Sequence, residues 1–202
     1  LWSWGDNYKG QLGQNASPWV TGDLSSPTQV GTDTSWTALA GVKGRMWALK
    51  GTEIYTWGYN GHGELGHNNE TDYSSPRQVP GTWKNIYSGS YQFLATKTDG
   101  TLWTCGRNSE GALGQNDTTN YSSPKQIPGT TWNEAACGYG KVVASKTDGT
   151  LWAWGTNEKG AAGNNTDPDA VDKYSSPIQI PGTNWTGKLF AGGYNSKALR
   201  LF

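Results

Sequence analysis

The sequence predicts an all-β fold: a β-propeller-like array of four blades, each built from four short antiparallel strands, with or without ring closure. One phrase carries most of the evidence, since LWSWGDNYKGQLG at 1–13 recurs at 54–66, 102–114 and 151–163. Units of about 50 residues that hold four strands each are the signature of propeller blades. No stretch of about ten residues shows the helical period of apolar side chains.

The LWxWG segment that opens each unit alternates its side chains between two faces, as a β-strand does. A second predicted strand, PxQI or PxQV, lies in the near-copies at 73–83, 121–132 and 174–185 and in a looser copy at 24–36. Proline cannot donate a backbone hydrogen bond to a neighbouring strand. We therefore expect the proline-bearing strand at the outer edge of its sheet.

A third predicted strand begins at a repeated tryptophan and ends at a small residue near a glycine, where backbones are expected to approach closely. The fourth, FLATK at 93–97 or VVASK at 142–146, runs through Thr-Asp-Gly-Thr into the next LWxWG segment. Asp-Gly between two alternating runs predicts a β-hairpin, because glycine tolerates a positive φ. The first unit shortens this turn to Gly51-Thr52-Glu53.

The chain divides into one repeat domain, 1–202, with units at 1–53, 54–101, 102–150 and 151–202. No blade can cover both of its faces alone, so we expect the Trp and Leu faces of neighbouring blades to form a shared core. Ten of the 12 tryptophans occupy shared repeat positions; Trp19 and Trp47 do not. The chain begins with LWSWG and ends with KALRLF, two complementary halves of a blade. This predicts either pairing of the first and last strands into a ring or a piece of a longer array.

Composition limits the partners. The net charge is zero and 16% of residues are charged, which argues against a nucleic-acid binder, for which a basic excess is typical. No apolar run approaches the ~18 residues that a membrane-spanning helix needs, so we expect no membrane insertion. The 12 Trp and 10 Tyr residues instead predict a core of aromatic side chains. The sequence leaves open a homo-oligomer or a larger assembly.

The spacing of glycine, asparagine and leucine after each LWxWG segment, followed by SSPxQI, resembles the regulator of chromosome condensation repeat family. The repeated positions are Gly5, Asn7, Gly10, Leu12 and Gly13, then Gly58, Asn60, Gly63, Leu65 and Gly66, then Gly106, Asn108, Gly111, Leu113 and Gly114. The fourth unit keeps Gly155, Asn157, Gly160 and Gly163 but has Ala162 in place of leucine. The resemblance covers the whole chain and implies a β-propeller, although familiar members have seven blades.

Members of this family include a nucleotide-exchange factor for a small GTPase, a plant ultraviolet photoreceptor and a secreted inhibitor of β-lactamases. The exchange factor acts through an inserted wedge, and no repeat here exceeds the others by more than a few residues. The photoreceptor's Gly-Trp-Arg-His-Thr motif is absent. The Asn- and Thr-rich phrasing is also similar to repeats in predicted bacteriophage proteins and bacterial surface proteins.

Candidate chemistry is sparse, and we expect no catalytic residue, no metal and no cofactor. His62 and His67 are expected in an exposed loop, without the ligands that would complete a metal site. Cys105 and Cys137 are expected as buried free thiols. The Asp- and Asn-rich loop 164–172 could hold Ca²⁺ through oxygen, but its spacing matches no EF-hand and a solvated loop is the simpler interpretation.

The predicted partner-binding residues come from comparing the units with one another. Four different polar residues occupy one repeat position before the second strand of each blade, and repeat symmetry places them on one rim near the ring axis. Neighbouring tyrosines add amphipathic surface suited to protein or saccharide partners, and one tryptophan stands in the irregular first loop. These residues are Arg45, Gln92, Lys141 and Asn195, with Tyr91, Tyr139, Tyr194 and Trp19.

The sequence therefore predicts a non-enzymatic interaction or structural module that binds a protein or a surface saccharide. We expect a virion-associated protein, such as a capsid or tail accessory, or a cell-surface adhesive protein, located outside the cell or on a virion. The alternative is an intracellular regulator of a GTPase, of the exchange-factor type. An enzyme built on the propeller face would need converging carboxylates, and the sequence shows no such pair.

Overall fold

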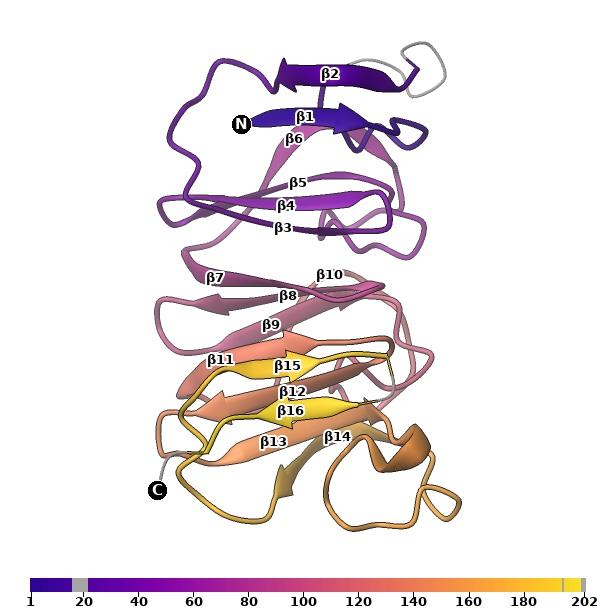
Figure 1. The fold of residues 1–202 in the computed structure, drawn as a ribbon, viewed down its shortest axis with the longest axis vertical. Helices are drawn as coiled ribbons and strands as arrows, with labels where there is room; N and C mark the ends of the chain where they lie inside the picture. The colour runs from indigo at the N-terminus through magenta and orange to yellow at the C-terminus, as the bar shows by residue number, and fades with distance from the viewer. Residues whose placement is uncertain (16–21, 194, 201–202) are drawn as a thin grey trace.

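The computed structural model describes residues 1–15, 22–193 and 195–200, and within them the fold is almost entirely β (Figure 1). Three four-stranded antiparallel sheets form its body, and we call them sheets I, II and III. Sheet I contains β3 (Ala38–Val42), β4 (Arg45–Lys50), β5 (Glu53–Gly58) and β6 (Tyr73–Val79). Sheet II contains β7 (Trp83–Ser88), β8 (Gln92–Lys97), β9 (Leu102–Gly106) and β10 (Tyr121–Gln126). Sheet III contains β11 (Trp132–Cys137), β12 (Lys141–Lys146), β13 (Leu151–Thr156) and β14 (Lys173–Ile180).

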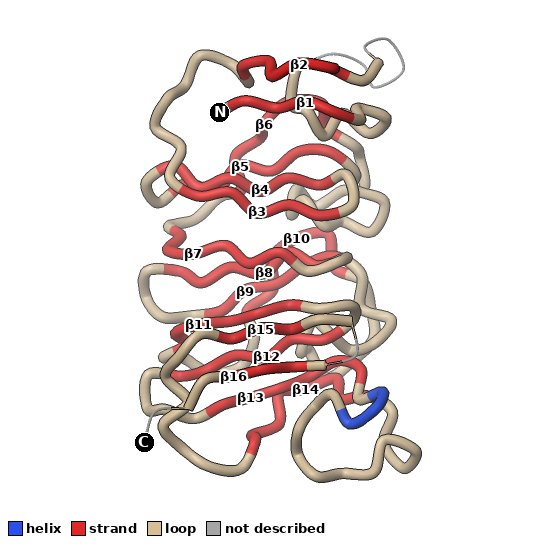
Figure 2. Tube along the Cα trace, in the orientation of Figure 1, coloured by secondary structure: helices blue, strands red, loops and turns tan. Residues whose placement is uncertain are grey.

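Two two-stranded sheets flank this body, β1 (Trp2–Gly5) with β2 (Leu24–Gln29) and β15 (Leu189–Ala191) with β16 (Ser196–Ala198). The sheets follow one another along the long axis, with the N-terminus at one end and the C-terminus near the other (Figure 1). Within the described residues one helical turn is formed, η1 (Glu158–Gly160), which follows β13 in the chain and is drawn in blue in Figure 2. The predicted all-β, propeller-like class is confirmed. The two-stranded sheets lie at opposite ends of an open array and do not pair with each other among the described residues.

The order of strands within each sheet follows the order of the chain, so the proline-bearing strands β6, β10 and β14 lie at sheet edges. This confirms the expectation drawn from proline's missing donor. The sequence units are offset from the sheets by half a blade, because the LWxWG segments form the third strand of a sheet, as β5, β9 and β13 do.

The Thr-Asp-Gly-Thr turns are formed as predicted. Gly100 and Gly149 have φ of +80° and +81°, a backbone conformation that suits glycine. The Asp99 carboxylate accepts hydrogen bonds from the backbone N–H of Thr101 at 3.0 Å and from its hydroxyl at 2.6 Å. Asp148 makes the same pair of bonds with Thr150. The aspartate therefore closes the turn that carries the chain into the third strand.

The repeated asparagine organises the loop that follows that third strand. The side-chain oxygen of Asn60 accepts a hydrogen bond from the backbone N–H of Leu65 at 2.9 Å. The side-chain Nδ2 of Asn60 donates to the Thr71 backbone carbonyl at 3.0 Å. The same bond recurs in the other repeats, where the backbone N–H of the residue five positions later donates to the side-chain oxygen of the asparagine. The distances are 3.1 Å at Asn7, 2.8 Å at Asn108 and 3.0 Å at Asn157. All four asparagines are buried, so each satisfies backbone groups that would otherwise be costly to bury.

The repeated Ser-Ser-Pro phrase joins neighbouring sheets. The backbone N–H of Asn68, in the loop after β5, donates to the carbonyl of Ser122 in the next sheet at 2.7 Å, and Asn116 bonds Ser175 in the same way. A side chain at Gly111 would lie 2.7 Å from the Cα of Ser175, which explains why glycine recurs there. The Ser-Ser-Pro segment of each repeat therefore accepts a backbone hydrogen bond from the loop of the preceding repeat.

The aromatic core lies between the sheets, as the sequence predicted. Trp57, Trp83 and Trp154 are each about 1% exposed. Trp4 has the same repeat position as Trp57 and Trp154 but is 60% exposed, because among the described residues β1 pairs only with β2. Burial of the repeated indole therefore requires a complete blade around it.

Candidate interaction surface

Turns between the first and second strands of sheets I, II and III bring together a group of basic and aromatic side chains. Lys43 lies in the β3–β4 turn, Tyr91 in the β7–β8 turn and Tyr139 in the β11–β12 turn. Arg107 follows β9 directly. The stacking of the sheets places these turns next to one another, and we call Lys43, Tyr91, Arg107 and Tyr139 the cation–tyrosine surface.

Lys43 connects the two tyrosines. Its Nζ donates to the Tyr91 hydroxyl at 3.0 Å and lies 4.4 Å from the centre of the Tyr91 ring and 5.3 Å from that of Tyr139. The two rings meet edge to face with centres 5.9 Å apart. Lys43 is exposed and the Tyr139 side chain is 43% exposed. A cation held between two aromatic rings is favourable, so this part of the surface is ordered while accessible to a partner.

Arg107 adds a second cation on the same ring. Its Cζ lies 5.1 Å from the centre of the Tyr91 ring, and its Nε donates to the Ser109 hydroxyl at 2.9 Å. Within the described part of the chain, neither Lys43 nor Arg107 forms an ion pair. The pKa of Tyr91 is lowered, first by its hydrogen bond from Lys43 and then by the charges of Lys43, Arg107 and Arg45. The cations around Tyr91 therefore favour the ionised form of its phenol.

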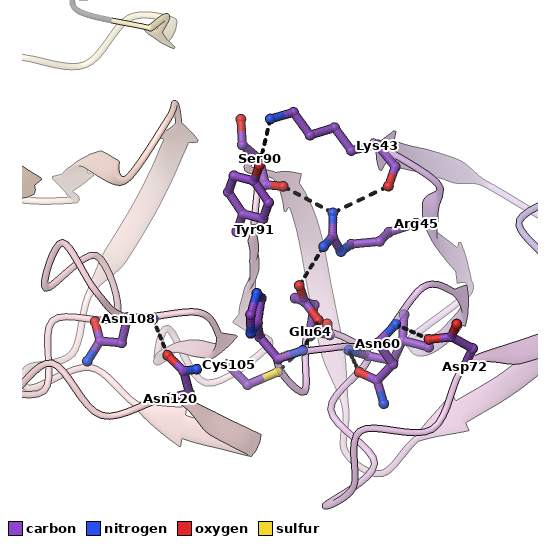
Figure 3. Close-up of polar contacts among 12 residues, drawn as sticks. Lys43, Arg45, Asn60, Glu64, Asp72, Ser90, Tyr91, Cys105, Asn108 and Asn120 are labelled. Atoms are coloured by element: carbon purple, nitrogen blue, oxygen red, sulfur yellow. Dashed lines mark hydrogen bonds and ion pairs between the residues drawn. The ribbon is translucent and has the colours of Figure 1, made fainter. Parts of the chain in front are cut away.

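Beneath this surface, Arg45 forms a buried ion pair. Its guanidinium contacts the Glu64 carboxylate at 2.6 Å, and both side chains are at most 1% exposed. The other terminal nitrogen donates to the Ser90 carbonyl at 3.2 Å and the Lys43 carbonyl at 3.4 Å (Figure 3). Arg45 therefore bonds to the Lys43 turn of sheet I and to the Tyr91 turn of sheet II, and so holds the two turns together. The Glu64 carboxylate balances the charge of Arg45.

The structure buries three of the four polar residues predicted to bind a partner and exposes the fourth. Arg45, Gln92 and Lys141 each open the second strand of a sheet, and all three side chains are buried. The neighbouring sheet covers that position and limits their access to a partner, and their role in partner binding stays a prediction. Asn195 is exposed and, with Trp185, lines a hollow of about 540 Å³ between sheet III and β15–β16.

Tyr91 and Tyr139 do lie at the surface, and their role in partner binding stays a prediction. Tyr194 and Trp19 lie outside the described residues. The sequence analysis missed Lys43 and Arg107. Lys43 precedes Arg45 by two positions, as Tyr139 precedes Lys141, and this shared position was the signal that could have identified it.

The two histidines are half-buried rather than exposed. The His67 Nε2 lies 2.9 Å from the Thr56 hydroxyl, and burial lowers the pKa of this imidazole, with the charge of Arg77 as a smaller cause. In the described ranges no group of three or more His, Cys, Asp or Glu side chains could hold a metal ion. Ca²⁺ binding by the loop 164–172 stays a hypothesis.

Cys105 and Cys137 are both free thiols, as expected, but Cys137 is half-buried rather than buried. Cys105 is fully buried, and burial raises the pKa of both thiols. The protonated thiol is a poor nucleophile, so these cysteines suit packing. Within the described residues the structure also has no helix with the length and hydropathy that crossing a membrane would require.

Comparisons with known proteins agree with this geometry. Residues 53–95 and 99–145 match the Regulator of chromosome condensation (RCC1) repeat. No curated protein matches the chain. Among solved structures, human WBSCR16 has 21% identity and a TM-score of 0.81, with 98% of this chain and 54% of that chain covered.

Two yeast structures are similar in the same way. Prp20p from Saccharomyces cerevisiae, whose structure was described with its binding to Gsp1p and histones, has 20% identity, a TM-score of 0.77 and coverage of 100% of this chain and 52% of its own. Yeast RCC1 (Prp20) bound to Kap60 has 19% identity, a TM-score of 0.75 and coverage of 100% and 50%. The present chain thus spans about half the length of each, and these likenesses show the propeller fold.

Proposed function

We propose that this chain, which carries repeats of the regulator of chromosome condensation type, is a non-enzymatic propeller module that binds a protein partner. The observation that carries the proposal is the cation–tyrosine surface, built from the turns of three successive sheets. Rigid aromatic side chains beside basic groups are typical of protein interfaces, where Tyr and Arg provide much of the binding energy. A scaffold of packed sheets holds these turns in fixed positions, which reduces the entropy cost of binding.

The similarity to Prp20p favours an exchange-factor-type regulator over the virion or adhesive role that we expected from the sequence. Prp20p binds Gsp1p and histones according to its reported structure, and both are proteins. Nothing in the comparisons supports a capsid, tail or adhesin role, or a saccharide ligand. We therefore carry forward the regulator as the finer proposal, and a protein ligand as the broader one.

Binding of purified Gsp1p and of purified histones to the immobilised chain tests the proposal. We expect at least one of them to bind, and Tyr139→Ala to weaken that binding by about 30-fold, the effect of losing an interface residue worth ~2 kcal/mol. Phe190→Ala is the matched control, because Phe190 is another exposed aromatic side chain, 54% exposed on β15. Its affinity should equal that of the unmodified chain.

Two outcomes would count against the proposal. If neither protein binds at micromolar concentration, the regulator assignment fails. If both variants lose affinity equally, the cation–tyrosine surface is not the contact face. Release of a fluorescent nucleotide from a small GTPase then distinguishes an exchange factor, which accelerates release, from a binding module that leaves its rate unchanged.

A further inference from the structure

We infer that the cation–tyrosine surface recognises an acidic segment of its protein partner, with carboxylates next to Lys43 and Arg107 and apolar atoms against Tyr139. This inference rests on the proposed protein-binding function and adds the chemistry of the partner.

Lys43 and Arg107 differ from neighbouring basic residues in how their charges are balanced. Two neighbouring basic side chains have carboxylate partners: Lys9 contacts Asp72 at 3.4 Å and Arg45 contacts Glu64 at 2.6 Å. Lys43 and Arg107 instead contact a tyrosine hydroxyl, a serine hydroxyl and aromatic rings. Among the described residues Lys43 has no carboxylate partner, and Arg107 is linked to a carboxylate only through the Ser109 hydroxyl, which donates to Glu110 Oε1 at 3.2 Å. A partner carboxylate that approaches these two cations therefore gains the attraction.

Both cationic side chains are preorganised in the unbound protein. Lys43 is already held between the rings of Tyr91 and Tyr139, and Arg107 is already held by Ser109 and Tyr91. Long basic side chains normally lose rotamer freedom when they pair with a ligand. Here part of that loss is incurred on folding, which leaves more of the electrostatic attraction available for binding.

Carboxylates limit the extent of the positive region. Glu110 packs against the β11–β12 turn, since a side chain on Gly140 would lie 2.8 Å from its Cγ. Glu64 and Asp72 lie on the other side, paired with Arg45 and Lys9. A phosphodiester backbone carries closely spaced charges that would also meet these carboxylates. A short, flexible acidic peptide can place one or two of its carboxylates at Lys43 and Arg107 and turn the others toward solvent, so it fits the narrow positive region better.

The test measures binding of three probes to the full chain by isothermal titration calorimetry: hexaglutamate, hexaglutamine and inorganic phosphate. We expect hexaglutamate to bind and the other two to bind at least tenfold more weakly. The variant with both Lys43→Gln and Arg107→Gln should bind hexaglutamate about tenfold more weakly, the sum of two exposed charge contacts. Lys84→Gln is the matched control, because Lys84 is an exposed lysine on β7, and its affinity should be unchanged.

A spectrophotometric titration of the tyrosines provides an independent reading. In the unmodified chain one phenol should ionise below the usual range, and Lys43→Gln should return it to that range while thermal unfolding is unchanged. Absence of such a phenol would overturn the inference, because the charges would not converge on Tyr91 in solution. Equal binding of phosphate or hexaglutamine would overturn it as well, in favour of a general anion site or of apolar binding.

The inference and the proposed function can fail separately. If hexaglutamate does not bind, yet Gsp1p or histones bind and Tyr139→Ala weakens them, the protein-binding function stands and the acidic chemistry falls. If hexaglutamate binds through Lys43 and Arg107 but neither protein binds, the surface chemistry stands and the regulator assignment falls.

Discussion

The junction between sheets I and II and the junction between sheets II and III solve one packing problem with different residues. At the first junction the buried pair is Arg45 with Glu64. At the second, the same two repeat positions hold Gln92 and Ala112, both buried. An ion pair at one junction is thus replaced by an uncharged pair at the next, with both members changed together.

The indole groups show the same pattern. At the second junction Trp154 donates from Nε1 to the Ala112 carbonyl at 2.8 Å, and Leu94 packs beside it. At the first junction the residue equivalent to Trp154 is Cys105, and Trp47 stands where Leu94 does. Trp47 donates to the Glu64 carbonyl at 3.4 Å, and the Cys105 thiol lies 3.9 Å from that oxygen. The large side chain has moved to the facing sheet, while its acceptor position is unchanged.

Residues that contact each other at a junction therefore differ from the equivalent residues of the next junction as pairs, not singly. A single member of a pair is free to change only when its partner changes too, because a buried charge or an indole-sized space is costly to leave uncompensated. Exchanging members between the junctions is therefore the way to test it.

The largest effect is expected from Glu64→Ala, which leaves the Arg45 guanidinium buried without its carboxylate. We expect a loss of about 3–5 kcal/mol in the free energy of unfolding, measured by urea denaturation. Adding Arg45→Gln recreates the Gln92–Ala112 pair of the second junction and should recover most of the loss. Equal losses in the single and double variants would show that the ion pair does not explain the first junction.

A smaller loss is expected from Trp47→Leu, which copies Leu94 into the first junction while Cys105 stays small. The resulting cavity should cost about 2–3 kcal/mol of unfolding free energy. Cys105→Trp alone overpacks the junction, at about 1–3 kcal/mol. The double variant restores the Leu94–Trp154 arrangement, so the two losses should fail to add by about 2 kcal/mol. Simple additivity in this cycle would contradict the pairing.

These pairs also mark how far the sequence could predict the structure. The strands, the proline edges and the Asp-Gly turns depend on local backbone chemistry, and the repeated letters revealed them. Burial of Arg45 depends on a neighbour 19 positions away, and the group of Lys43, Tyr91 and Tyr139 depends on how three sheets stack. Such contacts can be predicted only by comparing two repeat positions that face each other at a junction. The comparison of Arg45, Gln92, Lys141 and Asn195 used a single repeat position.

The third junction, between sheet III and β15–β16, is an incomplete version of the first. Lys141 takes the place of Arg45, but Ala161 takes the place of Glu64. The Lys141 side chain is 1% exposed, and its ammonium has no hydrogen-bond partner among the described residues. Burial lowers the pKa of Lys141 from 10.5 to about 8, whereas the ion pair balances the charge of Arg45.

Lys141→Met should therefore stabilise the chain, by about 1–3 kcal/mol at pH 7, the smallest of the three effects. The gain should depend on pH. Between pH 8 and 10.5 the unfolded chain binds more protons at Lys141 than the folded chain does, so the stability contributed by this position rises with pH. The advantage of the methionine variant should shrink across that window, in urea denaturation compared pH by pH with the unmodified chain. Lys84→Met, at an exposed lysine, should show no such trend. If the difference in unfolding free energy between the two chains were the same at every pH, the pKa of Lys141 would not be lowered by folding. Another group would then balance the Lys141 charge at the third junction.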